Sequence, residues 1–174
     1  IVESLGREGL KKGDRVIVLF PVSTRLYAVM TALFAAGLTA VFIDARMPLK
    51  RIAYAVKVSN AKAALSMKKF FLLRFIIPAL RRMTLYSVDS SGWGVQSLID
   101  RIDPGRLADR PFSAASLDQN HEAIVTFTSG TTGRPKAANR NHDLLLAQTR
   151  CVEQAHAQSP SRVCLTCFPV FALY

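Results

Sequence analysis

The residues best suited to chemistry lie in one short segment, residues 128–136, with the sequence TSGTTGRPK. Its first six residues are all glycine, serine or threonine, and a run of apolar residues precedes it. Glycines let the backbone approach an anion and turn successive N–H groups toward it, and the hydroxyl groups add further donors. Lys136 supplies a positive charge for a phosphate. The segment therefore predicts a loop that cradles a polyphosphate.

Two other interpretations of this loop are weaker. A solvated turn is also rich in serine, threonine and glycine, but it rarely combines two glycines with Pro135 and Lys136 directly after a buried strand. The Walker P-loop is excluded by spacing, because it places glycine and lysine side by side, followed by serine or threonine. Here Lys136 comes three residues after Gly133 and is followed by Ala137.

The rest of the chain alternates between strand and helix patterns, and these elements must position the loop. Apolar runs bounded by turn residues predict strands at 15–20, 40–43, 63–66, 84–88, 123–127 and 163–168. Periodic patterns predict helices at 24–36, 48–59, 69–82 and 142–158, the third interrupted by Pro78. Residues 100–119 predict a loop-rich linker. The alternation predicts an α/β fold, with a layered, mostly parallel, Rossmann-like sheet flanked by helices.

Several segments together resemble the adenylate-forming superfamily of AMP-binding enzymes, which includes acyl-CoA synthetases, luciferases and peptide-synthetase adenylation domains. Residues 128–136 resemble its signature motif. The resemblance extends over essentially the whole chain, through LKKGDRVIVLFP at 10–21, LFAAG at 33–37 with VFID at 41–44, and FPVFAL at 168–173. The last motif is most similar to long-chain fatty-acyl-CoA ligases and to the β-lactone synthetases of olefin biosynthesis.

The resemblance implies a reaction and a set of site residues. A carboxylate would attack the α-phosphate of ATP to give acyl-AMP and pyrophosphate, with Lys136 as the catalytic group and Mg²⁺ bridging the phosphates. Phe171 and Ala172 would line the acyl pocket, and no metal-ligating residue is predicted. A fatty or 3-hydroxy fatty acid is the expected substrate and CoA the expected acceptor, with β-lactone formation as the alternative. The cradle for the leaving phosphates would comprise Thr128, Ser129, Gly130, Thr131, Thr132, Gly133 and Lys136.

The resemblance also implies that residues 1–174 are a piece of a large N-terminal adenylation domain. Both ends of the sequence look cut, and the family's acidic metal-binding motif, its ribose-binding aspartate and its mobile C-terminal domain do not occur in these residues. Closure of that small domain normally completes the catalytic site. We therefore expect this piece to be inactive by itself.

Three positions depart from the family pattern. Ala137 stands where glycine usually follows the motif lysine, and an alanine would be strained there if the position needs a positive φ. Asn141 stands where threonine or serine often precedes the histidine that matches His142. Many ligases have a histidine where Ala172 stands, so its absence weakens a simple CoA-ligase assignment and is tolerable for a β-lactone synthetase.

Charge leaves one alternative from a different class of protein. The net charge of +11 favours a polyanionic partner. Residues 68–82, KKFFLLRFIIPALRR, are basic and apolar, as membrane-surface helices are, so a non-catalytic membrane-surface module is the alternative to an enzyme. Weak membrane association is compatible with either. Nucleic-acid binding is not expected, because no recognised module accompanies the charge.

Two further features bear on location. Cys164 and Cys167 predict structural thiols rather than a zinc site, and the small, odd number of cysteines predicts a reducing, cytoplasmic setting. Residues 26–43 carry no charge, but Gly37 divides them into a helical and a strand-like part. A buried strand–helix–strand unit therefore explains this run better than a membrane-spanning helix.

Overall fold

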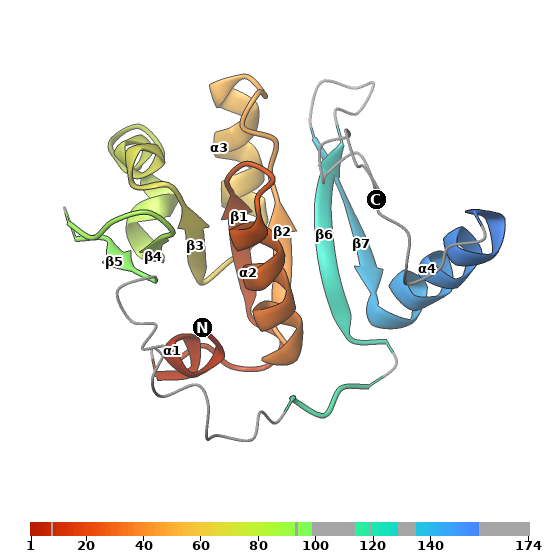
Figure 1. Cartoon of the computed structure of the whole chain (residues 1–174). Helices are drawn as coiled ribbons and strands as arrows, with labels where there is room; N and C mark the ends of the chain where they lie inside the picture. Colours follow the sequence, from red (N-terminus) through yellow and green to blue (C-terminus); the bar gives the residue numbers. More distant parts are fainter. Residues whose placement is uncertain (8, 93, 99–113, 119, 129–134, 157–174) are drawn as a thin grey trace.

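The structure is a computed structural model of the 174-residue chain, and it describes all residues except 8, 93, 99–113, 119, 129–134 and 157–174 (Figure 1). Its strands are β1 (Arg15–Leu19), β2 (Thr39–Phe42), β3 (Ala63–Ser66), β4 (Thr84–Ser87), β5 (Gln96–Ser97), β6 (Glu122–Thr128) and β7 (Lys136–Asn141). Its helices are α1 (Val2–Arg7), α2 (Thr24–Ala35), α3 (Leu49–Val58), the 3₁₀ helices η1 (Lys68–Phe75) and η2 (Pro78–Arg82), and α4 (His142–His156).

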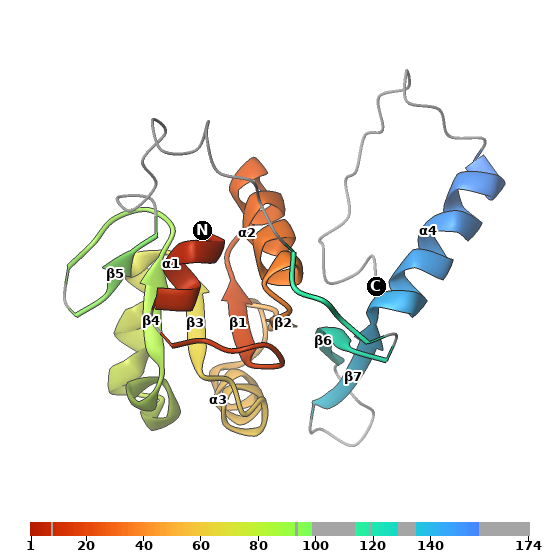
Figure 2. The ribbon, with the colours of Figure 1, turned by 90° about the horizontal axis from the view of Figure 1, so that it is seen from below.

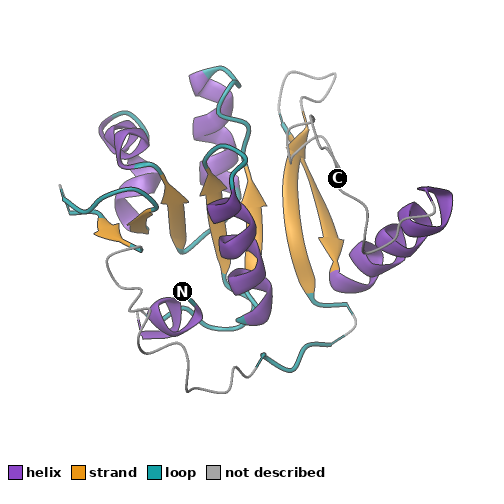
Figure 3. Ribbon diagram, in the orientation of Figure 1, coloured by secondary structure: helices purple, strands orange, loops and turns teal. Residues whose placement is uncertain are grey.

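The described strands form one sheet in the order β5-β4-β3-β1-β2-β6-β7. Every neighbouring pair is parallel except β6 and β7, which are antiparallel (strands in orange in Figure 3). Parallel neighbours need a long crossover, which explains why the helical segments alternate with the strands along the chain. The expected α/β fold with a mostly parallel sheet is confirmed.

Two helical layers cover opposite faces of this sheet (Figure 2). Successive strand residues point to opposite faces, so Val16 and Val18 pack with α1 and α2, whereas Ile17 packs with α3, η1 and η2. Strands buried on both sides read as continuous apolar runs, and for that reason they were recognisable in the sequence.

The expected end of the first long helix at Gly37 is also confirmed. Gly37 has a φ of +68°, a backbone conformation that residues with a side chain rarely adopt. A Cβ atom there would lie 2.9 Å from Cδ2 of Leu117. At the other end of α2, the hydroxyl of Ser23 accepts a hydrogen bond from the Leu26 N–H, as an N-cap residue does.

Residues 69–82 are helical and interrupted at Pro78, as expected, but they do not form an α-helix. The chain instead forms two separate 3₁₀ helices, because Ile77 before Pro78 takes an extended conformation with ψ of 94°. Phe71, Ile77 and Leu80 turn inward to the core, and Phe75 is left exposed. The apolar residues of this segment are therefore sorted between core and surface.

The remaining outcomes concern strand β7, the expected strand at 163–168 and the uncharged run at 26–43. Strand β7 was not predicted, because its sequence KAANRN is polar and gives no strand signal. The strand expected at 163–168 lies outside the described residues. The uncharged run at 26–43 divides between α2 and β2, as expected. Within the described residues, none of the helices has the length and apolar character needed to cross a bilayer.

Candidate functional site

The segment 128–136 joins β6 to β7 at one end of the sheet. Thr128 ends β6, Lys136 begins β7, and the two residues lie opposite each other in the antiparallel ladder. Strand β6 runs parallel to β2, so Thr128 lies at the edge where the parallel strands have their carboxyl ends. In open α/β sheets this edge is where ligands bind.

The structure thus places two of the predicted cradle residues, and it places them side by side. The remaining five, Ser129, Gly130, Thr131, Thr132 and Gly133, lie outside the described residues, as do the predicted pocket residues Phe171 and Ala172. Lys136 is exposed. Its predicted phosphate role stays a prediction.

The backbone at Ala137 answers the question that its sequence raised. Among the described residues, Asn60 is the non-glycine residue with a positive φ, so Ala137 has no such strain. Ala137 pairs with Phe127 as an ordinary member of the β6–β7 ladder. Alanine is therefore compatible with the backbone that follows the motif lysine.

A side-chain network ties the base of this hairpin to the rest of the sheet. Arg15 on β1 donates two hydrogen bonds to the carboxylate of Glu122, from Nε to Oε1 at 2.8 Å and from Nη2 to Oε2 at 3.0 Å. Arg15 also donates to the carbonyl of Ser59 at the end of α3, and Asn139 on β7 donates to Glu122 at 3.2 Å. Glu122 therefore joins β1, β6 and β7 through its carboxylate.

Further along the hairpin, Nη1 of Arg140 on β7 donates to the hydroxyl of Thr126 on β6 at 3.0 Å. The two parallel bonds from the Arg15 guanidinium to the Glu122 carboxylate fix the geometry of this pair as well as adding energy. Together these bonds fix both strands that carry the ends of the loop. No sequence pattern indicates the Arg15–Glu122 pair, because the two residues are far apart in the chain.

Two histidines pack where the hairpin joins α4. The rings of His121 and His142 are stacked with centroids 6.1 Å apart, and Phe34 of α2 meets His142 edge-on at 5.3 Å. Nε2 of His121 lies 2.9 Å from the carbonyl oxygen of Gly37. Burial lowers the pKa of His142, nearby His121 lowers it further, and Asp143 raises it. This packing favours a neutral His142 and holds the start of α4 against α2.

Asn141 caps α4. Its Oδ1 accepts a hydrogen bond of 2.8 Å from the Leu144 N–H, three residues on. Asparagine, serine and threonine all serve this purpose. The departure from the family's usual threonine or serine therefore keeps the same capping chemistry.

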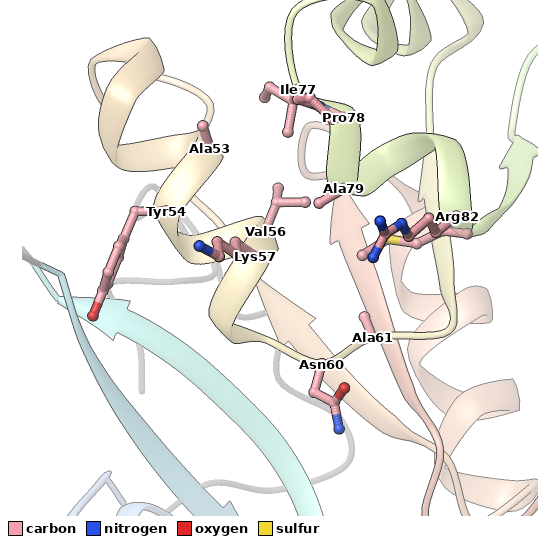
Figure 4. Close-up of a pocket in the computed structure, with 11 residues that line it drawn as sticks. Ala53, Tyr54, Val56, Lys57, Asn60, Ala61, Ile77, Pro78, Ala79 and Arg82 are labelled. Carbon is pink, nitrogen blue, oxygen red and sulfur yellow. The ribbon is translucent and has the colours of Figure 1, made fainter.

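Two hollows lie on the α3 side of the sheet. One of about 650 Å³ lies between α3 and η2, and none of its lining residues comes from β6 or β7 (Figure 4). A smaller one of about 200 Å³ borders the hairpin at Phe127, Ala137 and Asn139. Within the described part of the chain, no group of histidine, cysteine, aspartate or glutamate residues is arranged to hold a metal ion.

Comparison with known proteins decides the family. The model of the AMP-binding enzyme family matches residues 3–174. The chain belongs to this family. This confirms the resemblance inferred from the sequence motifs.

Two similar proteins and one similar solved structure show how much of a longer protein the chain matches. It is 27% identical to an uncharacterised acyl-CoA ligase, YtcI of Bacillus subtilis, over 82% of this chain and 26% of that protein. It is 25% identical to the olefin β-lactone synthetase of Stenotrophomonas maltophilia, over 95% of this chain and 30% of that protein. The crystal structure of ATP-bound MatB from Rhodopseudomonas palustris superposes with a TM-score of 0.80 at 23% identity, covering 98% of this chain and 33% of that one. The chain therefore spans between a quarter and a third of their lengths.

The cap at Asn141 is testable. Asn141→Ala leaves a helix N–H without its acceptor, so we expect it to lower the free energy of unfolding by about 1 kcal/mol. Asn141→Ser and Asn141→Thr keep an acceptor at this position and should lower it by much less. Thermal melting of the three variants beside the wild type measures the difference. Equal losses in all three variants would show that the cap does not stabilise α4.

Proposed function

We propose that this chain is part of an enzyme that activates a carboxylic acid by adenylation, consuming ATP and releasing pyrophosphate. One observation carries the proposal: in a chain of the AMP-binding family, the glycine- and hydroxyl-rich motif joins β6 to β7 at the carboxyl edge of the parallel sheet. A backbone nest next to a lysine suits a polyphosphate, and the position suits a ligand site.

The proposed chemistry needs no protein nucleophile. The substrate carboxylate attacks the α-phosphorus of ATP, a bond to the bridging oxygen breaks, and pyrophosphate leaves with the electrons of that bond. Catalysis then consists of holding the phosphates in line and stabilising charge as it moves onto the leaving group. In the proposal, the Ser, Thr and Gly residues of segment 128–133 hold those oxygens, and Lys136 supplies the positive charge.

Magnesium accompanies ATP in this proposal. Within the described residues, no group of histidine, cysteine, aspartate or glutamate side chains is arranged to hold the ion. Since the chain spans about a quarter to a third of its relatives' lengths, we propose that residues 1–174 supply the phosphate loop and part of the acid pocket. Catalysis then requires the rest of the protein, and this piece alone is inactive.

The fate of the acyl-adenylate is the finer question. We propose transfer to CoA, supported by the similarity to an acyl-CoA ligase, with a fatty or 3-hydroxy fatty acid as the substrate. The second candidate is β-lactone formation. It is favoured by the similarity to an olefin β-lactone synthetase over 95% of this chain, and by Ala172 where many ligases have a histidine.

Exchange of labelled pyrophosphate into ATP by the full-length protein tests the proposal. Because adenylation is reversible, exchange should occur only when the correct acid is present. A panel of fatty acids, 3-hydroxy fatty acids and short acids also reports the substrate class. Exchange that does not depend on any acid, or no exchange with the whole panel, would contradict adenylation.

The same assay tests Lys136. Lys136→Ala removes a positive charge aimed at the departing pyrophosphate, so we expect exchange to slow by roughly 10²- to 10³-fold, as when one preorganised donor is lost from an oxyanion hole. Acid selectivity should hardly change, and the protein should stay folded because the side chain is exposed. Lys57→Ala, at an exposed lysine of α3, is the matched control and should leave the rate unchanged. A Lys136→Ala variant with the wild-type rate but altered chain-length preference would exclude the phosphate role.

A further inference from the structure

One long part of the chain carries almost all of its net charge. Between Asp44 and Asp89 the sequence contains no aspartate or glutamate, although the whole chain has 12 of them. The same stretch contains ten of the 23 basic residues, so the remainder of the chain is nearly neutral. The ten are Arg46, Lys50, Arg51, Lys57, Lys62, Lys68, Lys69, Arg74, Arg81 and Arg82.

The fold gathers this stretch on one side of the molecule. Its helical elements α3, η1 and η2 all cover the same face of the sheet, opposite α1 and α2 (Figure 2). Lys62 pairs with Asp14, and Arg46 pairs with Asp44. Within the described residues, the cations of α3 and η2 form no salt bridge with an acidic residue. This layer, formed by residues 49–58 and 68–82, is hereafter called the basic face.

An apolar tip projects from the basic face. Phe75 is 64% exposed and Ile76 is 62% exposed, the highest values among the large apolar side chains of the described residues. They lie at the junction of η1 and η2, and nearby Leu72 is 47% exposed. Exposing adjacent large apolar side chains to water is unfavourable, which marks the tip as a contact site.

The shape of the tip is fixed by arginines. Arg81 donates from Nε to the carbonyl of Arg74 at 2.8 Å and from Nη2 to the carbonyl of Phe75 at 3.1 Å. The guanidinium of Arg74 lies over the Phe75 ring, 5.2 Å from its centroid. The tip therefore presents apolar side chains and guanidinium groups together, with its backbone already held.

Beside the tip, the hollow between α3 and η2 also combines apolar and basic side chains. Its apolar lining includes Val56, Ala79 and Ile77, and the guanidinium end of Arg82 reaches over it toward α3 (Figure 4). Lys57 lines it from α3. An anionic group attached to an apolar chain matches such a surface in both charge and polarity.

We propose that the basic face binds peripherally to an anionic lipid bilayer, with Phe75 and Ile76 entering the interface and the lysines and arginines contacting the lipid headgroups. Basic surfaces are attracted to anionic bilayers, and apolar side chains next to them add burial in the headgroup region. The inference does not depend on the proposed enzymatic activity. A bilayer fits better than a nucleic acid, because the aliphatic Ile76 has no stacking role and the Phe75 ring already lies against Arg74.

Vesicle sedimentation of the full-length protein tests this proposal. Phosphatidylcholine vesicles containing phosphatidylserine should bind the protein, binding should fall as salt is added, and pure phosphatidylcholine vesicles should bind much less. The double variant with Phe75→Ser and Ile76→Ser should bind more weakly by about tenfold or more, because both substitutions remove apolar burial. Lys69→Glu with Arg82→Glu should weaken it by more than tenfold, since each basic residue near such a surface contributes roughly fivefold.

A matched pair of substitutions away from the basic face is the control. The control combines Tyr27→Ser on α2 with Arg150→Glu on α4. The first removes an exposed aromatic side chain (48% exposed), and the second reverses an exposed positive charge, as the test substitutions do. They should leave vesicle binding unchanged. Equal losses in control and test pairs, or vesicle binding that no pair alters, would overturn the proposal.

A fluorescence measurement separates insertion from attraction to any polyanion. Compared with the unsubstituted protein, Phe75→Trp should add a tryptophan emission component that shifts to the blue with anionic vesicles and does not shift with neutral ones. Binding to single-stranded RNA should be no tighter than to the anionic vesicles. Absence of the shift, or tight RNA binding by the unsubstituted protein when it fails to bind anionic vesicles, would assign the face to another polyanion and overturn the lipid proposal.

Discussion

The antiparallel pairing of β7 on β6 is the constraint on which the candidate site depends. All other neighbouring strands of the sheet are parallel, and parallel strands cannot be joined by a tight hairpin turn. Reversing direction at β6 lets both ends of the segment 128–136 stay at the same edge of the sheet, with Thr128 opposite Lys136. A glycine-rich segment is then held at two fixed points without needing strong conformational preferences of its own.

Three sets of side-chain contacts hold the β6–β7 hairpin in turn. Arg15 reaches from β1 across the neighbouring strand position to Glu122, and Arg140 joins β7 to β6. The stacked pair His121 and His142 lies next to Glu122, at the end of the hairpin where β7 becomes α4. Because charge-assisted bonds and ring packing act on different residues of one hairpin, they keep its direction relative to the parallel strands. The site is therefore positioned by side chains that do no chemistry themselves.

The sequence could predict the parallel core because buried strands leave a long apolar signal and helices a periodic one. The phosphate role of residues 128–136 stays a prediction, and the structure places only the two ends of that segment. The sequence could not predict β7, whose polar residues gain their strand conformation only by pairing with β6. Nor could it predict the ties from Arg15 and His121, because a pair between residues far apart in the chain exists only once the fold has formed. The 3₁₀ form of residues 68–82 was not predictable for a similar reason, because it depends on the burial of Phe71, Ile77 and Leu80 in the folded core.

The central claim is that residues 128–136 hold the phosphates of ATP. Hydrogen–deuterium exchange of the full-length protein, followed by mass spectrometry with and without ATP and Mg²⁺, tests it most directly. Backbone N–H groups that bind phosphate oxygens exchange more slowly, so the peptides covering 128–136 should gain the largest protection within residues 1–174. Pyrophosphate alone should reproduce part of that protection. Protection by ATP that appears elsewhere in the chain while residues 128–136 exchange as before would contradict the account.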